Sequence, residues 1–144
     1  MPAFLIVANQ SLGSRALETA IQDRFAAGDA TFHVVVPATP IPHRMTWDEA
    51  EAREAAEDRL QAVLGRLRTM GAEADGEVGS PDPVAAVTDV IRSRSFDEII
   101  LSTLPAGISR WLGLDVPHRL RGAVHCPVVV VTEAPEPSPE PSSG

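Results

Sequence analysis

The chain has 144 residues, of which 44% are hydrophobic and 22% are charged. This length favours one globular domain, because a domain of this size buries roughly 68–70% of its unfolded surface. The net charge of -8 argues against a nucleic-acid or anionic-membrane partner, since both attract positively charged proteins. All 12 basic residues are arginine. The lack of lysine excludes a Walker A phosphate loop and Schiff-base chemistry, because both need an amine.

Cysteine content and targeting patterns narrow the protein class further. Cys126 is the only cysteine, so it cannot form a disulfide within the chain, and no cysteine cluster suggests zinc. The apolar run at 3–8 is too short for a signal peptide, and no stretch reaches membrane-spanning length. We therefore expect a cytoplasmic protein without a membrane partner.

The first elements are marked by short apolar runs at 4–8 and 32–36, which predict two buried strands. Between these runs, apolar residues recur every four positions from Leu17 to Phe25. This spacing predicts a helix, and Gly28 stands where that helix would end.

A second, longer helix is predicted after a proline-marked loop. Thr46 and Glu49 have the spacing of a capping box, in which the hydroxyl and the carboxylate bind free backbone N–H groups reciprocally. Gly71 closes the helix. Its predicted buried stripe consists of Leu60, Val63, Leu64 and Leu67.

The second half of the chain continues the alternation of strands and helices. Small and acidic residues alternate at 72–78, which predicts a half-exposed edge strand whose carboxylates discourage pairing with another chain. Pro83 suits the first turn of a third helix. The remaining predicted elements are a strand at 98–101, a helix that Asp115 caps and that ends near Ala123, and a strand at 126–132.

The alternation predicts a single α/β domain over residues 1–132, a doubly wound parallel sheet with helices on both faces. In such sheets, ligands bind outside the carboxyl ends of the strands, where the strand order reverses. Residues 133–144 alternate proline with glutamate and serine and have no apolar group to bury. We expect this tail to be disordered.

Two segments carry a family resemblance. DEIILSTLPAGISRWLGLDVPHRLRGAVHCPVVVV, residues 97–131, combines a strand, a glycine-containing loop, a helix and a Cys-Pro-Val strand, and FLIVANQS, residues 4–11, combines a strand and a polar turn. Over residues 3–132 the chain resembles a divergent member of the universal stress protein (UspA-like) family. The resemblance implies five strands in the order 3-2-1-4-5. It also implies a stress-responsive regulatory protein, not an enzyme, that binds ATP or AMP between strands 1 and 4 and forms a homodimer through strand 5.

The resemblance also assigns a nucleotide site. Nucleotide-binding members have a glycine, two residues, a glycine, nine residues, then a glycine followed by serine or threonine. Here Ser102 stands in place of the first glycine, and Leu114 and Asp115 replace the closing pair. The positions that the resemblance assigns to an adenine nucleotide are Asn9 and Val36 beside the base and ribose, and Ser102, Thr103, Gly107, Ser109, Arg110 and Asp115 in or beside the phosphate loop.

These departures make the phosphate loop degenerate. A phosphate loop works because its glycines let backbone N–H groups approach the anion, and Pro105 has no N–H group. Asp115 is expected to cap a helix with its carboxylate and to place negative charge where a phosphate would lie. Arg110 or Arg119 compensates if either points into the cleft. AMP tolerates these changes better than ATP, and an empty cleft remains an alternative.

A second hypothesis assigns no nucleotide to the chain and makes it a homodimeric interaction module. The strand at 126–132 contains four consecutive valines, and an apolar edge strand invites pairing with a second copy. Val130→Asp should therefore disrupt the dimer. Among the histidines, His33 is interpreted as a hydrogen-bonded strand residue, and no pair has metal-ligand spacing. We expect neither a metal site nor catalytic residues.

Overall fold

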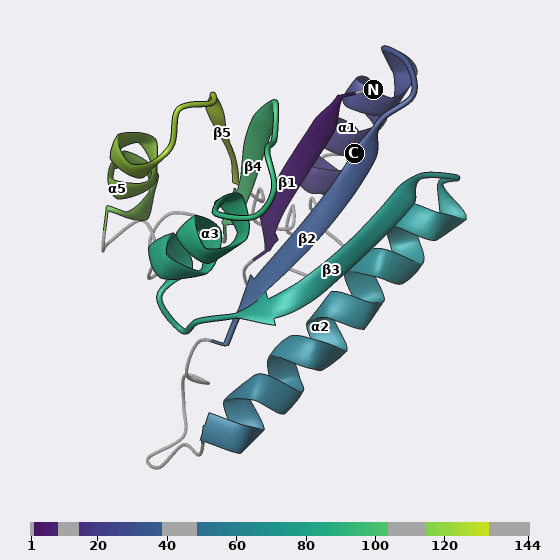
Figure 1. Ribbon diagram of the computed structural model, residues 1–144. Helices are drawn as coiled ribbons and strands as arrows, with labels where there is room; N and C mark the ends of the chain where they lie inside the picture. Colours follow the sequence, from purple (N-terminus) through teal and green to yellow (C-terminus); the bar gives the residue numbers. More distant parts are fainter. Residues whose placement is uncertain (1, 9–14, 39–48, 104–114, 133–144) are drawn as a thin grey trace, which may run out of the picture.

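The computed structural model describes residues 2–8, 15–38, 49–103 and 115–132. Within them, parallel strands form one sheet in the order β3-β2-β1-β4-β5 (Figure 1). The predicted doubly wound sheet and its strand order are thus confirmed. The strands are β1 Ala3–Ala8, β2 Thr31–Pro37, β3 Glu73–Gly79, β4 Glu98–Thr103 and β5 Val128–Thr132.

Helices cover both faces of this sheet (Figure 1). Helices α1 Arg15–Ala26 and α2 Glu49–Thr69 pack on one face, and α3 Pro83–Ile91 and α5 Val116–Ala123 pack on the other. The central strand β1 sends side chains alternately to the two faces. Ile6 belongs to the α1–α2 core and Leu5 to the α3–α5 core, and both are fully buried. A strand enclosed on both faces has no polar positions, which explains the unbroken apolar run in the sequence.

The long helix α2 agrees with its predicted apolar pattern. The four residues of the predicted stripe, Leu60, Val63, Leu64 and Leu67, are all buried in the α1–α2 core. The chain leaves the helix at Gly71, whose φ of 86° is a left-handed conformation that favours glycine. The capping box predicted at Thr46 lies outside the described residues.

The predicted start of the fifth strand was wrong by two residues, because β5 begins at Val128 rather than at Cys126. Pro127 has no N–H group to donate to a neighbouring strand. Its carbonyl nevertheless accepts a hydrogen bond from the Ile99 N–H at 2.9 Å. The residue therefore guides the chain into the sheet without belonging to the strand.

Strand β3 is an edge strand, as predicted from its alternation of small and acidic residues. Glu73, Asp75 and Glu77 are exposed, while Ala74 and Gly76 between them are partly buried. A Cβ atom at Gly76 would lie 2.5 Å from Leu60 Cδ1 in α2, and one at Gly79 would lie 2.7 Å from Ala86 Cβ in α3. The two glycines thus allow helices to approach this strand closely from both faces.

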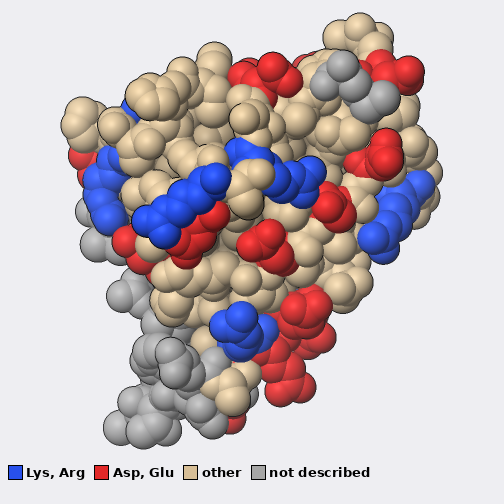
Figure 2. All heavy atoms as spheres, viewed as in Figure 1, with Lys and Arg blue, Asp and Glu red and all other residues tan. Residues whose placement is uncertain are grey.

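The surface carries charges of both signs. Figure 2 shows arginines interspersed with aspartates and glutamates over the face in view. This mixture forms no continuous basic surface on the described part of that face. No helix in the described ranges is long and apolar enough to span a membrane.

Candidate functional site

The candidate site lies at the carboxyl ends of β1 and β4. These strands are neighbours, and Ala8 pairs with Ser102 at the ends of the ladder between them. From β1 the sheet continues to β2 and β3 on one side and to β4 and β5 on the other, so the strand order reverses here. This reversal is the switch point at which doubly wound sheets bind ligands.

Three residues of adjacent strands form a row just below this edge. Ala8 pairs with Ser102, and Val36 lies one position beyond the Val7–Val35 pair of β1 and β2. Ala8 and Val36 both belong to the α1–α2 core. Val36 is 1% exposed and Ser102 is 0% exposed. The two predicted site residues therefore lie in the floor of the site rather than on an open wall.

The structure places the other predicted site residues unevenly. Thr103 is the last residue of β4, and it pairs with Thr132 of β5. Four of the predicted positions, Asn9, Gly107, Ser109 and Arg110, lie outside the described residues. The sheet thus brings together Val36, Ser102 and Thr103 at one edge, while the predicted loop contacts stay predictions.

Asp115 precedes α5 as predicted, but the expected side-chain cap was wrong. Within the described residues its carboxylate makes no capping hydrogen bond. Its backbone is left-handed, with φ of 57° and ψ of 37°, whereas an N-cap residue is normally extended. The Asp115 carbonyl still accepts the Arg119 N–H at 3.1 Å and so begins the helical hydrogen-bond pattern. The carboxylate is exposed and remains a negative charge near the helix start.

Arg119 does not serve as the compensating charge that the sequence offered for Asp115. Its Nη2 atom instead lies 3.3 Å from Asp82 Oδ2. The other carboxylate oxygen of Asp82 accepts the Val84 N–H at 3.1 Å and caps α3. One aspartate therefore caps α3 and binds α5 through Arg119. This ion pair connects the first turns of the two helices on the α3–α5 face.

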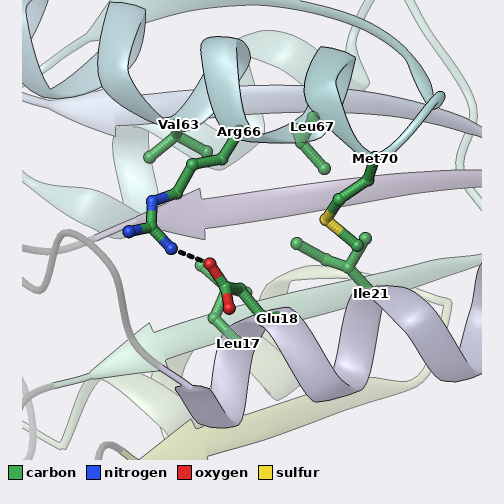
Figure 3. Close-up of a pocket in the computed structure, with 7 residues that line it drawn as sticks. All are labelled: Leu17, Glu18, Ile21, Val63, Arg66, Leu67 and Met70. Atoms are coloured by element: carbon green, nitrogen blue, oxygen red, sulfur yellow. Dashed lines mark ion pairs between the residues drawn. The ribbon is translucent and has the colours of Figure 1, made fainter.

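A small hollow lies between α1 and α2, on the face of the sheet opposite to α3 and α5 (Figure 3). Its walls include Leu17, Ile21 and Met70, and an ion pair between Glu18 and Arg66 crosses its opening. The enclosed volume is about 20 Å³, which suffices for one water molecule. This hollow is too small for a nucleotide.

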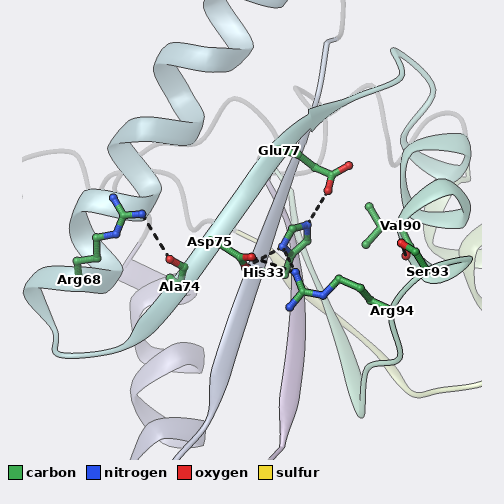
Figure 4. A network of polar contacts seen from close by, with 8 residues as sticks. All are labelled: His33, Arg68, Ala74, Asp75, Glu77, Val90, Ser93 and Arg94. Atoms are coloured by element: carbon green, nitrogen blue, oxygen red, sulfur yellow. Dashed lines mark hydrogen bonds and ion pairs between the residues drawn. The ribbon is translucent and has the colours of Figure 1, made fainter.

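Sequence reasoning missed a polar cluster on the α3–α5 side of β2 and β3 (Figure 4). The cluster contains His33, Asp75, Glu77 and Arg94, which lie far apart in the sequence. His33 is buried and hydrogen-bonded, as predicted. The alternating acidic residues of β3 were a visible signal in the sequence. That Asp75 lies beside His33, however, follows only from the register of β3 against β2.

Charges in this cluster shift the acidity of Asp75. Burial raises the pKa of the Asp75 carboxyl, but hydrogen bonds and attraction from His33 and Arg94 outweigh it, so the pKa is lowered overall. The carboxylate therefore stays ionised under mildly acidic conditions. Its contribution to stability is present above the unfolded pKa of about 3.9 and is lost as the pH falls through the lower folded value.

Cys126 is predicted to react slowly with alkylating agents. Burial raises the pKa of its thiol, and the carboxylates of Asp97 and Glu98 raise it further, although a backbone hydrogen bond acts in the opposite direction. Since the thiolate is the nucleophile, the native protein should react with iodoacetamide at about pH 8 at least about fivefold more slowly than the guanidinium-unfolded chain. Mass spectrometry of quenched samples measures both rates. Equal rates in the two states would contradict the prediction.

The strand order and the switch point define a doubly wound α/β protein. No protein-family model and no curated protein matches the sequence. Several solved structures match the fold. A universal stress protein from Archaeoglobus fulgidus has a TM-score of 0.64 and 17% identity, covering 91% of this chain and 93% of that one. A universal stress protein family protein from Arabidopsis thaliana with AMP bound has a TM-score of 0.64 and 16% identity, covering 98% of both chains.

The third match is a universal stress protein in complex with cAMP. Its TM-score is 0.53 and its identity is 20%, and the match covers 92% of this chain and 98% of that one. Together these likenesses show that the chain has the universal stress protein fold. The low identities fit a divergent sequence on that fold.

Proposed function

We propose that this chain is a cytoplasmic stress-response regulator whose cleft at the ends of β1 and β4 binds an adenine nucleotide without turning it over. The supporting observation is the fold, because similar structures carry AMP or cAMP. The row of Val36, Ala8 and Ser102 provides a closed floor at the switch point. The assigned loop residues provide the phosphate contacts.

The proposed site favours one phosphate over three. Asp115 presents an exposed carboxylate at the start of α5, and Arg119 is already paired with Asp82. At about 4 Å, two like charges repel by ~1–4 kcal/mol, depending on the local dielectric. This repulsion grows with each phosphate that approaches Asp115. AMP is therefore the expected ligand, and ATP binding is weaker.

Calorimetric titration with AMP, cAMP and magnesium-ATP tests this function. We expect AMP to bind in the micromolar range, and Gly107→Val to abolish binding, because a side chain there blocks the backbone from the phosphate. Asp115→Asn should strengthen ATP binding by about tenfold, since it removes ~1.4 kcal/mol of repulsion. Nucleotide released from the purified protein by denaturation should be measured first, because bound nucleotide would mask the titration.

Gly122→Val is a matched control for the glycine substitution. Gly122 is exposed on α5, and a Cβ atom there would meet nothing within 4 Å. The control should bind AMP as the wild type does. If neither the wild type nor the control binds any of the three nucleotides, and none is carried through purification, the nucleotide proposal fails.

A homodimeric interaction module without a nucleotide is the second candidate function. The observation that favours it is β5, which forms an edge of the sheet with four consecutive valines. These valines are only partly buried in the single chain. Pairing of two β5 strands would cover them and satisfy the free backbone groups of the edge. This candidate requires the dimer and is independent of nucleotide binding.

A further inference from the structure

His33 lies in β2 and faces the α3 side of the sheet, where it is 4% exposed. Its Nε2 atom is 3.0 Å from Glu77 Oε2, and its Nδ1 atom is 2.9 Å from Asp75 Oδ1. Arg94, which follows α3, places Nη1 2.7 Å from the same Nδ1 atom. Figure 4 shows the two carboxylates of β3 and the guanidinium converging on the ring from different sides.

The two neighbours of Nδ1 require opposite states of that atom. Arg94 only donates hydrogen bonds, so Nδ1 must accept through its lone pair when it pairs with Arg94. The Asp75 carboxylate only accepts, so Nδ1 must carry a proton when it pairs with Asp75. Among the described residues, Glu77 is the partner of Nε2, which therefore carries a proton in both cases. The neutral ring therefore pairs with Arg94, and the protonated ring pairs with Asp75.

The charges around His33 favour this exchange. When the ring is neutral, Arg94 is the one cation that faces the carboxylates of Asp75 and Glu77. When the ring is protonated, it adds a second cation beside the same two carboxylates. The ring also faces Phe96 at a centroid distance of 6.1 Å, and His33 is paired with Leu5 of β1 in the sheet. Arg94 also contacts two other groups. Its Nη1 atom lies 3.1 Å from Asp75 Oδ2, and its Cζ atom lies 5.5 Å from the Phe96 ring centroid.

We propose that His33 is a proton-operated switch that exchanges Arg94 for Asp75 at Nδ1. In the acidic state the imidazolium binds Asp75 and Glu77 together and ties the edge strand β3 to β2. In the neutral state Arg94 binds the ring and ties the segment after α3 to the sheet. The switch rests on this cluster alone and does not depend on a nucleotide.

Nitrogen and proton NMR of the wild-type protein tests the exchange. Between about pH 8 and about pH 5, where histidine side chains change charge, Nδ1 of His33 should pass from unprotonated to protonated while Nε2 stays protonated. The guanidinium signals of Arg94 should shift with the same midpoint. His118 and His125 are exposed and lie outside this cluster, so their ring signals serve as controls. A proton on Nδ1 over the whole range, or Arg94 signals that do not follow the ring, would overturn the proposal.

Hydrogen exchange of the β3 amides provides a second test. Their protection factors should rise at least about threefold on acidification over this range, because the protonated ring donates to both Asp75 and Glu77 and holds β3 against β2. Asp75→Asn should remove most of that rise. The control is Asp89→Asn, since Asp89 is an exposed carboxylate of α3 that pairs with Arg92 and does not contact His33. Equal pH responses in the two variants would overturn the proposal even if the NMR titration of His33 were observed.

Discussion

Gly76→Ala is expected to destabilise the protein by about 3 kcal/mol, near the upper end of the usual cost of overpacking. The added Cβ atom would lie 2.5 Å from Leu60 Cδ1 and 2.6 Å from the Val34 carbonyl oxygen. Leu60 lies on the buried side of α2, where its side chain has little room to change conformation. The Val34 oxygen belongs to the neighbouring strand, so relief requires a shift of the backbone. The loss should lower the melting temperature by about 6–12 °C in a chain of this size.

Gly65→Ala is the matched control for this substitution. Gly65 lies on the exposed side of α2, and a Cβ atom there would meet nothing within 4 Å. Alanine in a helix interior is more favourable than glycine by up to ~1 kcal/mol, so this variant should be slightly more stable than the wild type. Guanidinium unfolding monitored by circular dichroism measures both. If Gly76→Ala unfolds within about 0.5 kcal/mol of the wild type, then α2 does not press on β3 as closely as the structure indicates.

The fold was predictable because its signals are local. The start of α3 is one example, since Pro83 occupies the first turn, as the sequence indicated. The structure adds that Asp82 caps this helix by accepting the Val84 N–H. The apolar stripe of α2 is another, because helical periodicity alone identifies its buried side. The uniform apolar character of β1 further required a strand enclosed on both faces, and therefore helices on both sides.

The parts that sequence reasoning missed depend on how distant segments are aligned. The contact of His33 with Asp75 follows from the register of β2 against β3, which no local pattern specifies. The ion pair of Arg119 with Asp82 joins two helices separated by β4. Asp115 illustrates a different limit. Its residue type favours a helix cap, but its left-handed backbone directs the carboxylate away from that role.

Strand β5 combines features of a buried strand with the position of an edge strand. Its valines resemble those of a central strand, yet within the described residues only β4 pairs with it. Natural edge strands usually carry charges or prolines that prevent association. β3 follows this rule with Asp75 and Glu77, whereas the valine run of β5 does not. The contrast between the two edges is the argument for a partner at β5.

Val130→Pro is expected to weaken the proposed dimer by at least about tenfold while the single chain stays folded. The Pro127 carbonyl accepts from Ile99 and so points toward β4. Backbone groups of successive strand residues point to opposite sides, so Val129 also faces β4, and Val130 faces the free edge. Proline is tolerated in an edge strand where its missing N–H would face outward. In a symmetric dimer, the substitution removes one donor from each copy.

Two further variants separate the dimer from the stability of the single chain. Val129→Pro removes a hydrogen bond to β4 and should destabilise the fold itself by about 1–3 kcal/mol, because the acceptor in β4 loses its donor. Val130→Asp should also dissociate the dimer, but the Val130 side chain packs against the α3–α5 core, so a carboxylate there destabilises the single chain as well.

Sedimentation velocity at micromolar concentration, together with circular dichroism, distinguishes these effects. A folded Val130→Pro variant that sediments as a monomer beside a dimeric wild type would support pairing through β5. An unchanged dimer in both Val130 variants would place the interface elsewhere, because neither the backbone nor the side chains of this edge would then hold the copies together.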